Sequence, residues 1–214
     1  NGNKYVSKSA NGFDPDGKNY IFKIDNAGNA TLFHESPQTI GDLAIDSNDK
    51  IYILGSGAHK RVMSIETNNG VKGAVNENFA TGFDPQNPST IGIDKNDDIF
   101  VGLADHSSTN YERRIHKIDK TSGSHSLYLS MPQSNFGSVS HNQPTDIAFD
   151  SNNIMYLAIR SSGGKVYKVT DNGNTIDMDW LIRDNVTDAT ARGGFCPVSI
   201  FFDEFDNLYL YSHD

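Results

Sequence analysis

The chain has 214 residues and a formal net charge of −9 at pH 7. Its acidic balance, with no basic run longer than Arg113-Arg114, argues against nucleic-acid binding. No apolar run approaches the ~18 residues of a bilayer-spanning helix, so membrane insertion is not expected. The chain contains 12 Phe and 9 Tyr, which supply enough core volume for one domain covering residues 1–214.

Residues 1–19 are polar and contain turn chemistry, and beyond them one type of hairpin recurs. Its two strands alternate apolar and polar residues on either side of a turn that ends in glycine, which is typical of half-exposed strands. The first strands of these hairpins are expected at 20–25, 62–66, 115–119 and 166–170. Their turn glycines, for which we expect positive φ, are Gly28, Gly70, Gly123 and Gly173.

A second, more apolar hairpin lies between these outer hairpins. It recurs at 41–53, 88–101, 144–157 and 197–210. In each copy an aspartate stands five residues before the second apolar triplet, and these residues are Asp46, Asp94, Asp150 and Asp203. Each aspartate begins a tight turn in which its carboxylate can accept backbone N–H bonds. We therefore assign these four residues a structural role.

The spacing of the four aspartates, which is 48, 56 and 53 residues, predicts a β-propeller. An inner hairpin followed by an outer hairpin makes one four-stranded blade. The chain opens on an outer hairpin at 20–33 and closes on an inner one at 198–211. The simplest closed object is a ring of four blades, in which 208–211 pairs with 20–24 and leaves no open edge. The alternative is an excerpt of a longer propeller.

The repeat resembles a known group of proteins. The sequence Pro-x-x-Ile-x-Ile/Phe-Asp, followed by Ile-Tyr-Ile/Leu and then by Ile/Val-x-Lys-Ile/Val-Asp with a Gly turn, is similar to the NHL and SMP-30/gluconolactonase β-propellers. The resemblance covers most of residues 20–211 and implies the fold. It does not imply one function, because this fold carries many. These relatives usually have six blades.

Connection lengths point to one face of the propeller as a binding surface. The turns inside each hairpin are short, whereas the connections between hairpins are long and share one face in a propeller. These connections are 34–41, 54–61, 76–90, 102–114, 130–145, 158–165 and 182–198. Arginine forks suit carboxylates, and aromatic rings suit sugars or partner side chains. The candidate ligand-binding residues are Tyr111, Arg113, Arg114, Arg160, Arg192 and Phe195.

Oxygen-bearing side chains at the start of each inner hairpin form a second candidate site. Four residues before the repeat aspartates stand Asp42, Thr90, Asp146 and Ser199. Close to the axis they could hold Ca²⁺, Na⁺ or ordered water, or they could cap local turns. In the lactonases that the chain resembles, Asn or Asp metal ligands stand one position earlier. The matching residues here are Gly41, Ser89, Thr145 and Val198. None of them is a carboxylate, which argues against lactonase chemistry by that route.

Two functions fit these features. The first is a non-catalytic binding or adhesion module, extracellular or on a cell or virion surface, that recognises a glycan or a protein through its long loops. It could form part of a larger chain or assembly. The alternative is a metal-dependent hydrolase or lactonase with its site at the propeller axis, built on Asp42 and Asp146.

Overall fold

A computed structural model describes residues 3–9, 17–84, 86–104, 113–131, 143–160, 165–170, 175–177 and 197–212. Within these residues the protein is all-β, as the turn-punctuated sequence predicted. No helix of the described part is long and apolar enough to cross a membrane.

The strands form five antiparallel sheets in the described part of the chain, each ordered as in the sequence. The first sheet contains β1 (Lys4–Lys8), β2 (Asn19–Ile24) and β3 (Ala30–Ser36). The second contains β4 (Ile40–Ile45), β5 (Ile51–Gly55), β6 (Val62–Asn68) and β7 (Val71–Ala80). The third contains β8 (Asn87–Ile93), β9 (Ile99–Ala104), β10 (Arg113–Ile118) and β11 (His125–Met131). The fourth contains β12 (Gln143–Phe149), β13 (Met155–Arg160), β14 (Lys165–Thr170) and β15 (Thr175–Asp177), and the fifth contains β16 (Pro197–Phe202) and β17 (Leu208–Ser212).

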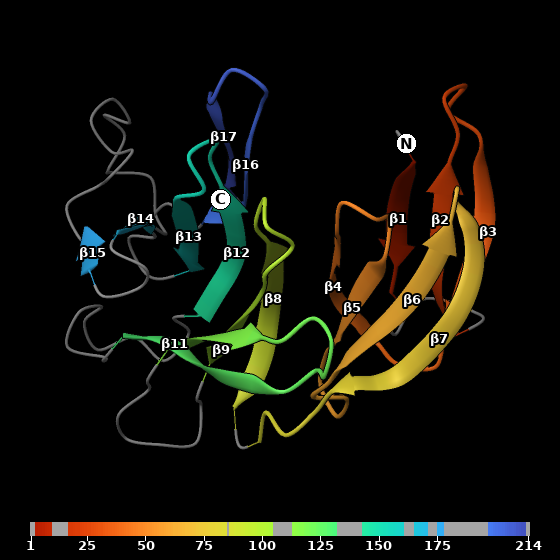
Figure 1. Cartoon of the computed structure of the whole chain (residues 1–214), viewed down its shortest axis with the longest axis horizontal. Helices are drawn as coiled ribbons and strands as arrows, with labels where there is room; N and C mark the ends of the chain where they lie inside the picture. The colour runs from red at the N-terminus through yellow and green to blue at the C-terminus, as the bar shows by residue number, and fades with distance from the viewer. Residues whose placement is uncertain are drawn as a thin grey trace.

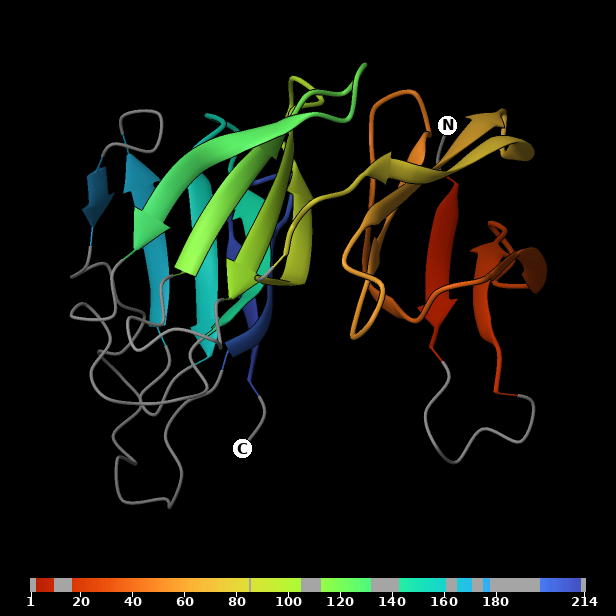
Figure 2. The same ribbon diagram turned by 90° about the horizontal axis from the view of Figure 1, so that it is seen from below.

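The sheets follow one another along an arc, as the colours from red to blue in Figure 1 show. The first strands of successive sheets are neighbours, because β4 contacts β8, β8 contacts β12 and β12 contacts β16. Figure 2 shows the same strands from below, with the sheet β1–β3 at the opposite end of the arc from β12–β17. The inner and outer hairpins expected from the sequence are both present.

The repeat aspartates organise the inner turns as expected. Oδ1 of Asp46 accepts hydrogen bonds from the backbone N–H groups of Asn48 and Lys50, both at 2.9 Å. The same pair of bonds recurs at Asp94, Asp150 and Asp203. Each carboxylate thus satisfies two amides that the tight turn would otherwise leave without a partner.

A residue three positions after each repeat aspartate takes positive φ and reaches the preceding sheet. These residues are Asp49, Asp97, Asn153 and Asp206, with φ of 64°, 62°, 65° and 62°. Ser47 donates to the Asp97 carboxylate from its backbone N at 2.8 Å and from its Oγ at 2.7 Å. The backbone N–H of Lys95 donates to Asn153 Oδ1 at 3.0 Å. Ser151 donates to the Asp206 carboxylate from both its backbone N and its Oγ, as Ser47 does to Asp97. Asx side chains tolerate this backbone conformation, which here aims them at the neighbouring turn.

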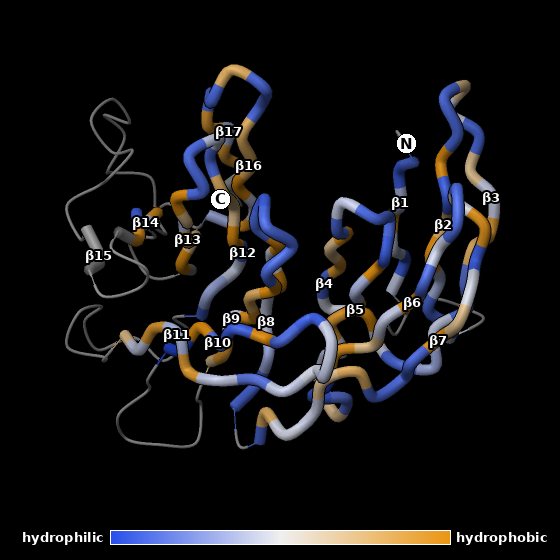
Figure 3. The backbone as a smooth tube through the Cα atoms, viewed as in Figure 1, coloured by the Kyte–Doolittle hydropathy of each residue, from blue (hydrophilic) through white to orange (hydrophobic). Residues whose placement is uncertain are grey.

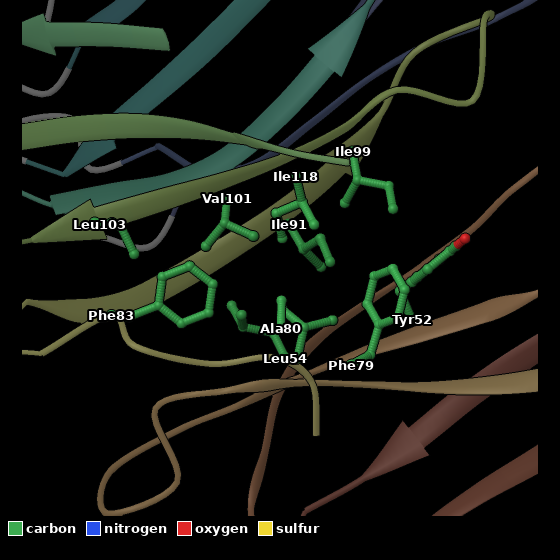
Figure 4. Close-up of a cluster of buried hydrophobic side chains, with 11 residues drawn as sticks. Tyr52, Leu54, Phe79, Ala80, Phe83, Ile91, Ile99, Val101, Leu103 and Ile118 are labelled. Atoms are coloured by element: carbon green, nitrogen blue, oxygen red, sulfur yellow. The ribbon is translucent and has the colours of Figure 1, made fainter. Parts of the chain in front are cut away.

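Apolar cores lie between successive sheets. Figure 4 shows the core between the second and third sheets, where Tyr52, Leu54 and Phe79 meet Ile91, Ile99 and Val101. Further clusters join the first sheet to the second, the third to the fourth, and the fourth to the fifth. Figure 3 shows apolar stretches on strands such as β5 and β13. Strand β5 is buried along its whole length because sheets cover both of its faces.

Small residues permit close approach between the inner strands. Two residues before the repeat aspartate stand Ala44, Gly92, Ala148 and Phe201 in the four inner strands. A Cβ at Gly92 would lie 2.8 Å from Cβ of Ile147 on the next sheet, so no larger residue fits there. Phe201 breaks the series, and its side chain is 57% exposed on the outer face of the fifth sheet.

The expected ring closure is not present, and this part of the prediction was wrong. Within the described residues β17 pairs with β16, while β2 pairs with β3 on one side and with β1 on the other. The start of the polar N-terminal segment, for which the sequence predicted no strand, forms β1, with Lys4 opposite Ile24 and Lys8 opposite Tyr20. That strand occupies the edge of β2 that 208–211 would have needed.

Two of the expected loops are shorter than the sequence indicated. Strand β7 continues to Ala80 and β8 begins at Asn87, so much of the expected 76–90 connection is extended strand. Strand β4 begins at Ile40, only a few residues after β3 ends at Ser36. Positive φ is confirmed for Gly28, Gly70 and Gly123, whereas Gly173 lies outside the described residues.

Two turn glycines should differ in their tolerance of alanine. Gly28 has φ of 86° with open space where a Cβ would stand, whereas Gly123 has φ of 72° and a Cβ there would collide with the carbonyl oxygen of Phe79. We expect Gly28→Ala to cost about 1 kcal/mol of unfolding free energy, from backbone strain alone. Gly123→Ala should cost clearly more, because the second sheet must also move. Urea denaturation of the two variants measures both losses, and equal losses would contradict the contact between Gly123 and Phe79.

Candidate functional site at the start of the inner strands

Each inner strand carries a β-bulge at the same place. The pairing of β4 with β5 skips from Ile40 to Asp42, and corresponding skips follow Pro88 in β8, Pro144 in β12 and Pro197 in β16. Bulges add one residue, bend the strand and redirect the side chains beside them, and they are common near functional sites. The bulged residues are Gly41, Ser89, Thr145 and Val198, and the four candidate oxygen ligands stand directly after them.

The first carboxylate, Asp42 on β4, joins two sheets. Its Oδ2 accepts hydrogen bonds from Thr90 Oγ1 at 2.9 Å and from the backbone N–H of Ile91 at 3.0 Å, both on β8. Its Oδ1 accepts the N–H of Leu43 at 2.8 Å. Three of the four acceptor positions of the carboxylate are therefore occupied.

The second carboxylate, Asp146 on β12, repeats this arrangement two sheets further along. Its Oδ2 accepts hydrogen bonds from Ser199 Oγ at 2.7 Å and from Ile200 N–H at 2.8 Å, both on β16. Its Oδ1 accepts the N–H of Ile147 at 2.8 Å. The four candidate residues thus form two carboxylate–hydroxyl pairs, Asp42 with Thr90 and Asp146 with Ser199.

Burial sets the electrostatics of both carboxyl groups. Burial raises the pKa of Asp42 to about 6, and the negative charge of Asp146 adds to the effect, while the hydrogen bonds from Ile91, Thr90 and Leu43 oppose it. Burial also raises the pKa of Asp146, against the hydrogen bonds from β16. The negative charge of Asp146 therefore opposes ionisation of Asp42.

Two bulged residues have hydroxyl groups that link the sheets. Ser89 Oγ lies 2.6 Å from the carbonyl oxygen of Pro144, and Thr145 Oγ1 lies 2.7 Å from that of Pro197. A hydroxyl has a single proton, and here that proton connects one inner strand to the next. In this chain the hydroxyl groups of Ser89 and Thr145 therefore hold neighbouring sheets together.

The residues proposed for ligand binding lie in different environments. Arg113 stands in β10 rather than in a loop and is 2% exposed, so the expectation of an exposed loop arginine was wrong for it. Arg114 is half-buried, and its Nη1 donates to the side-chain amide of Gln86 at 2.6 Å. Arg160 is the last residue of β13, where its backbone pairs with Gln143. Tyr111, Arg192 and Phe195 lie outside the described residues.

The oxygen atoms at the inner strands match the donors that hard cations prefer. Each carboxylate keeps one acceptor position on Oδ1, and the hydroxyls of Thr90 and Ser199 keep their lone pairs. Carboxylate and hydroxyl oxygens are ligands for Ca²⁺. The described part of the chain contains no group of three or more His, Cys, Asp or Glu side chains placed to hold a metal ion. A cation here would therefore depend on hydroxyls or water for several of its ligands.

Comparisons with known proteins support the fold. At the level of sequence, no family model and no curated protein matches this chain. Among solved structures, streptogramin B lyase matches with a TM-score of 0.58 at 17% identity, covering 96% of this chain and 66% of the lyase. A gluconolactonase from Xanthomonas campestris matches with a TM-score of 0.57 at 12% identity, covering 93% of this chain and 67% of that enzyme. Luciferin-regenerating enzyme matches with a TM-score of 0.54 at 19% identity, covering 73% of this chain and 50% of the enzyme.

These similarities agree with the resemblance noted in the sequence. The chain has a β-propeller fold that is similar to those of these enzymes, and it spans half the length of luciferin-regenerating enzyme. At these identities the likeness extends to the fold alone. Three of the neighbours are enzymes, so the fold is one on which catalysis occurs.

The interaction between the carboxyl groups of Asp42 and Asp146 can be measured directly. We expect the Asp42 carboxyl group to titrate near the value of about 6 that burial and Asp146 produce. Because Asp42 ionises in the unfolded chain before it does so in the folded one, its contribution to stability falls as the pH rises from about 4 to about 6. Asp146→Asn removes a negative charge and should lower the Asp42 pKa. Carbon-13 NMR of the aspartate carboxyl groups gives both midpoints. An Asp42 midpoint that does not change in Asp146→Asn would contradict the coupling, and Asp84→Asn on the exposed surface is the control.

Proposed function

We propose that this protein is a hydrolase or lactonase whose reaction centre lies at the bulged starts of β4 and β12. Its substrate class is a small polar molecule with an ester or lactone bond. The observation that supports this proposal most directly is the raised pKa of the Asp42 carboxyl group. Burial and the charge of Asp146 hold it at about 6. Perturbed carboxyl groups of this kind are concentrated at functional sites.

The two carboxyl groups suit different roles. Asp42 exchanges its proton near neutral pH, which is the requirement for a general acid or base. The negative charge of Asp146 raises the pKa of Asp42 and so keeps the Asp42 carboxylate basic. Hydrogen bonds from β8 and β16 hold both carboxylates in position, so they are oriented before a substrate arrives.

A hard divalent cation is part of this proposal. The free acceptor positions of Asp42 and Asp146, with the hydroxyls of Thr90 and Ser199, would hold it. Such a cation polarises the carbonyl group of an ester and lowers the pKa of a bound water. It would also relieve the repulsion between the two carboxylates.

A substrate panel tests the proposal. Purified protein is assayed against lactones and esters with added Ca²⁺ and after chelation, beside Asp42→Asn and Asp146→Asn. We expect turnover in the parent protein and a loss of about 100-fold or more in kcat in each variant, because general acid–base groups contribute that much. Asp84→Asn is the matched control, since Asp84 is 79% exposed and pairs only with Lys60 among the described residues' ion pairs.

The outcomes separate the parts of the proposal. Turnover that chelation abolishes supports the cation, and turnover that resists chelation assigns the chemistry to the carboxyl groups alone. With a cation bound, Asp146→Asn should lower the melting temperature in Ca²⁺ and matter much less after chelation. Absence of turnover across the panel, or turnover equal to that of the parent protein in folded Asp42→Asn and Asp146→Asn, would overturn the proposal.

A second candidate function, a module that binds a glycan or a protein, is favoured by the outer face of the fifth sheet. Phe201, Tyr209 and Tyr211 are 57%, 47% and 61% exposed there. The rings of Phe201 and Tyr209 stack with their centroids 4.9 Å apart and their planes within 8°. Exposed aromatic groups of this kind mark interaction surfaces, and their flat rings offer apolar area at low entropic cost.

Glycan-array binding tests this second candidate. We expect the parent protein to bind a defined subset of glycans and Phe201→Ala or Tyr209→Ala to lose that binding at least several-fold. Val71→Ala is the matched control, because Val71 on β7 is 69% exposed and distant in the fold. Binding that persists in both aromatic variants, or an array with no bound glycan, would count against a glycan ligand at this face.

A further inference from the structure

Two histidines on the outer hairpin of the third sheet face one another. His116 lies on β10 and His125 opens β11, where it stands opposite Ile118. The bulge between Ile115 and His116 adjusts the register at this point. The two Nδ1 atoms are 2.8 Å apart, and the ring centroids are 5.0 Å apart.

The hydrogen bonds of His125 determine where its proton lies. Its Nε2 is 3.0 Å from the carbonyl oxygen of Thr81, and a carbonyl can only accept, so Nε2 carries the proton. In the neutral ring the lone pair is therefore on Nδ1, directed at Nδ1 of His116. The separation of 2.8 Å requires one proton between the two nitrogens, and His116 donates it. Phe83 stacks on the His125 ring at 4.5 Å and fixes its plane.

We propose that His116 and His125 form a binding site for a borderline transition-metal ion of the Zn²⁺, Ni²⁺ or Cu²⁺ type. The metal takes the place of the proton between the two Nδ1 atoms. Neutral His116 moves its single ring proton from Nδ1 to Nε2 by exchange with solvent, and the Nδ1 lone pairs of both rings then bind the ion. Water completes the coordination, since imidazole nitrogen is a preferred ligand of these ions.

The surroundings of the pair resemble those of known metal ligands. A histidine that binds a metal usually donates its other ring N–H to a carbonyl or carboxylate, as His125 does to Thr81. Nitrogen ligands of a tetrahedral Zn²⁺ lie about 3.3 Å apart, given bonds of about 2.0–2.1 Å, so the two rings need to separate by only about half an ångström.

The charged groups around the pair limit the expected affinity. Arg114, on the same strand as His116, places a positive charge near the site and opposes a divalent cation. We therefore expect binding of moderate strength, with a stabilising effect on the hairpin β10–β11. Because His125 also bonds to Thr81, a bound metal ties this hairpin to the segment that follows β7. This site is distinct from the axial carboxyl groups and does not depend on the proposed enzymatic activity.

Titration calorimetry with each metal salt tests the proposal on the whole chain. Cys196 is replaced by Ser in every protein used, because a thiolate would compete for the same ions. We expect one equivalent of Zn²⁺, Ni²⁺ or Cu²⁺ to bind at neutral pH, and Ca²⁺ not to bind at this site. His116→Gln and His125→Gln should each weaken binding about tenfold or more. His59→Gln is the matched control and should bind as the parent does.

A second measurement keeps the test decisive if a variant unfolds. Nitrogen-15 NMR of the imidazole rings in the Cys196→Ser protein should show that Zn²⁺ shifts Nδ1 of both His116 and His125 and leaves His59 unchanged. The melting temperature should rise with Zn²⁺ concentration in this protein and in His59→Gln, but not in a folded His116→Gln. Metal binding of unchanged strength in both pair variants, or shifts at neither Nδ1 atom, would overturn the proposal.

Discussion

Hydrogen bonding between neighbouring inner turns is the constraint on which the rest of this propeller depends. Each repeat aspartate closes its own turn, and in the third, fourth and fifth sheets the residue three positions later extends to the inner turn of the preceding sheet. Asp97 and Asn153 reach their partners because they take positive φ, a conformation that costs little for Asx side chains. These hydrogen bonds set the distance between adjacent sheets and bring their apolar faces into contact. Each pair of adjacent sheets therefore shares a core of its own.

The same spacing creates the candidate site. A bulge at the start of every inner strand redirects the residues beside it, and in two sheets this brings a carboxylate to a hydroxyl and an amide of the next sheet. Asp42 and Asp146 therefore hold sheets together and, being buried, keep raised pKa values. The hydrogen bonds that join the sheets thus also keep these carboxyl groups buried, and burial is what raises their pKa values.

The inner strands are not equivalent despite their shared repeat. Alanine or glycine allows the next sheet to approach in the second, third and fourth sheets, whereas Phe201 stands at that position in the fifth. Aromatic side chains thus cover a face that in the other sheets is a packing surface. The outer hairpin of the third sheet differs in another way, because two imidazole rings share a proton where the other sheets have no such pair in the described residues.

The sequence by itself determined the hairpins, the inner-turn role of Asp46 and its equivalents, and the propeller class, because alternation and turn chemistry act over a few residues. It also identified the four oxygen-bearing residues at the inner strands, since their offset from the repeat aspartate is constant.

Only the tertiary structure decided that Lys4–Lys8 pairs with β2, that Arg113 is buried, and which donors meet Asp42. The register of the β10–β11 hairpin indicates that His116 and His125 lie close together. The bulge beside His116 and the hydrogen bond between His125 and Thr81 are visible only in the structure. Such features depend on which distant segments compete for the same edge or atom, and local patterns carry no information about that competition.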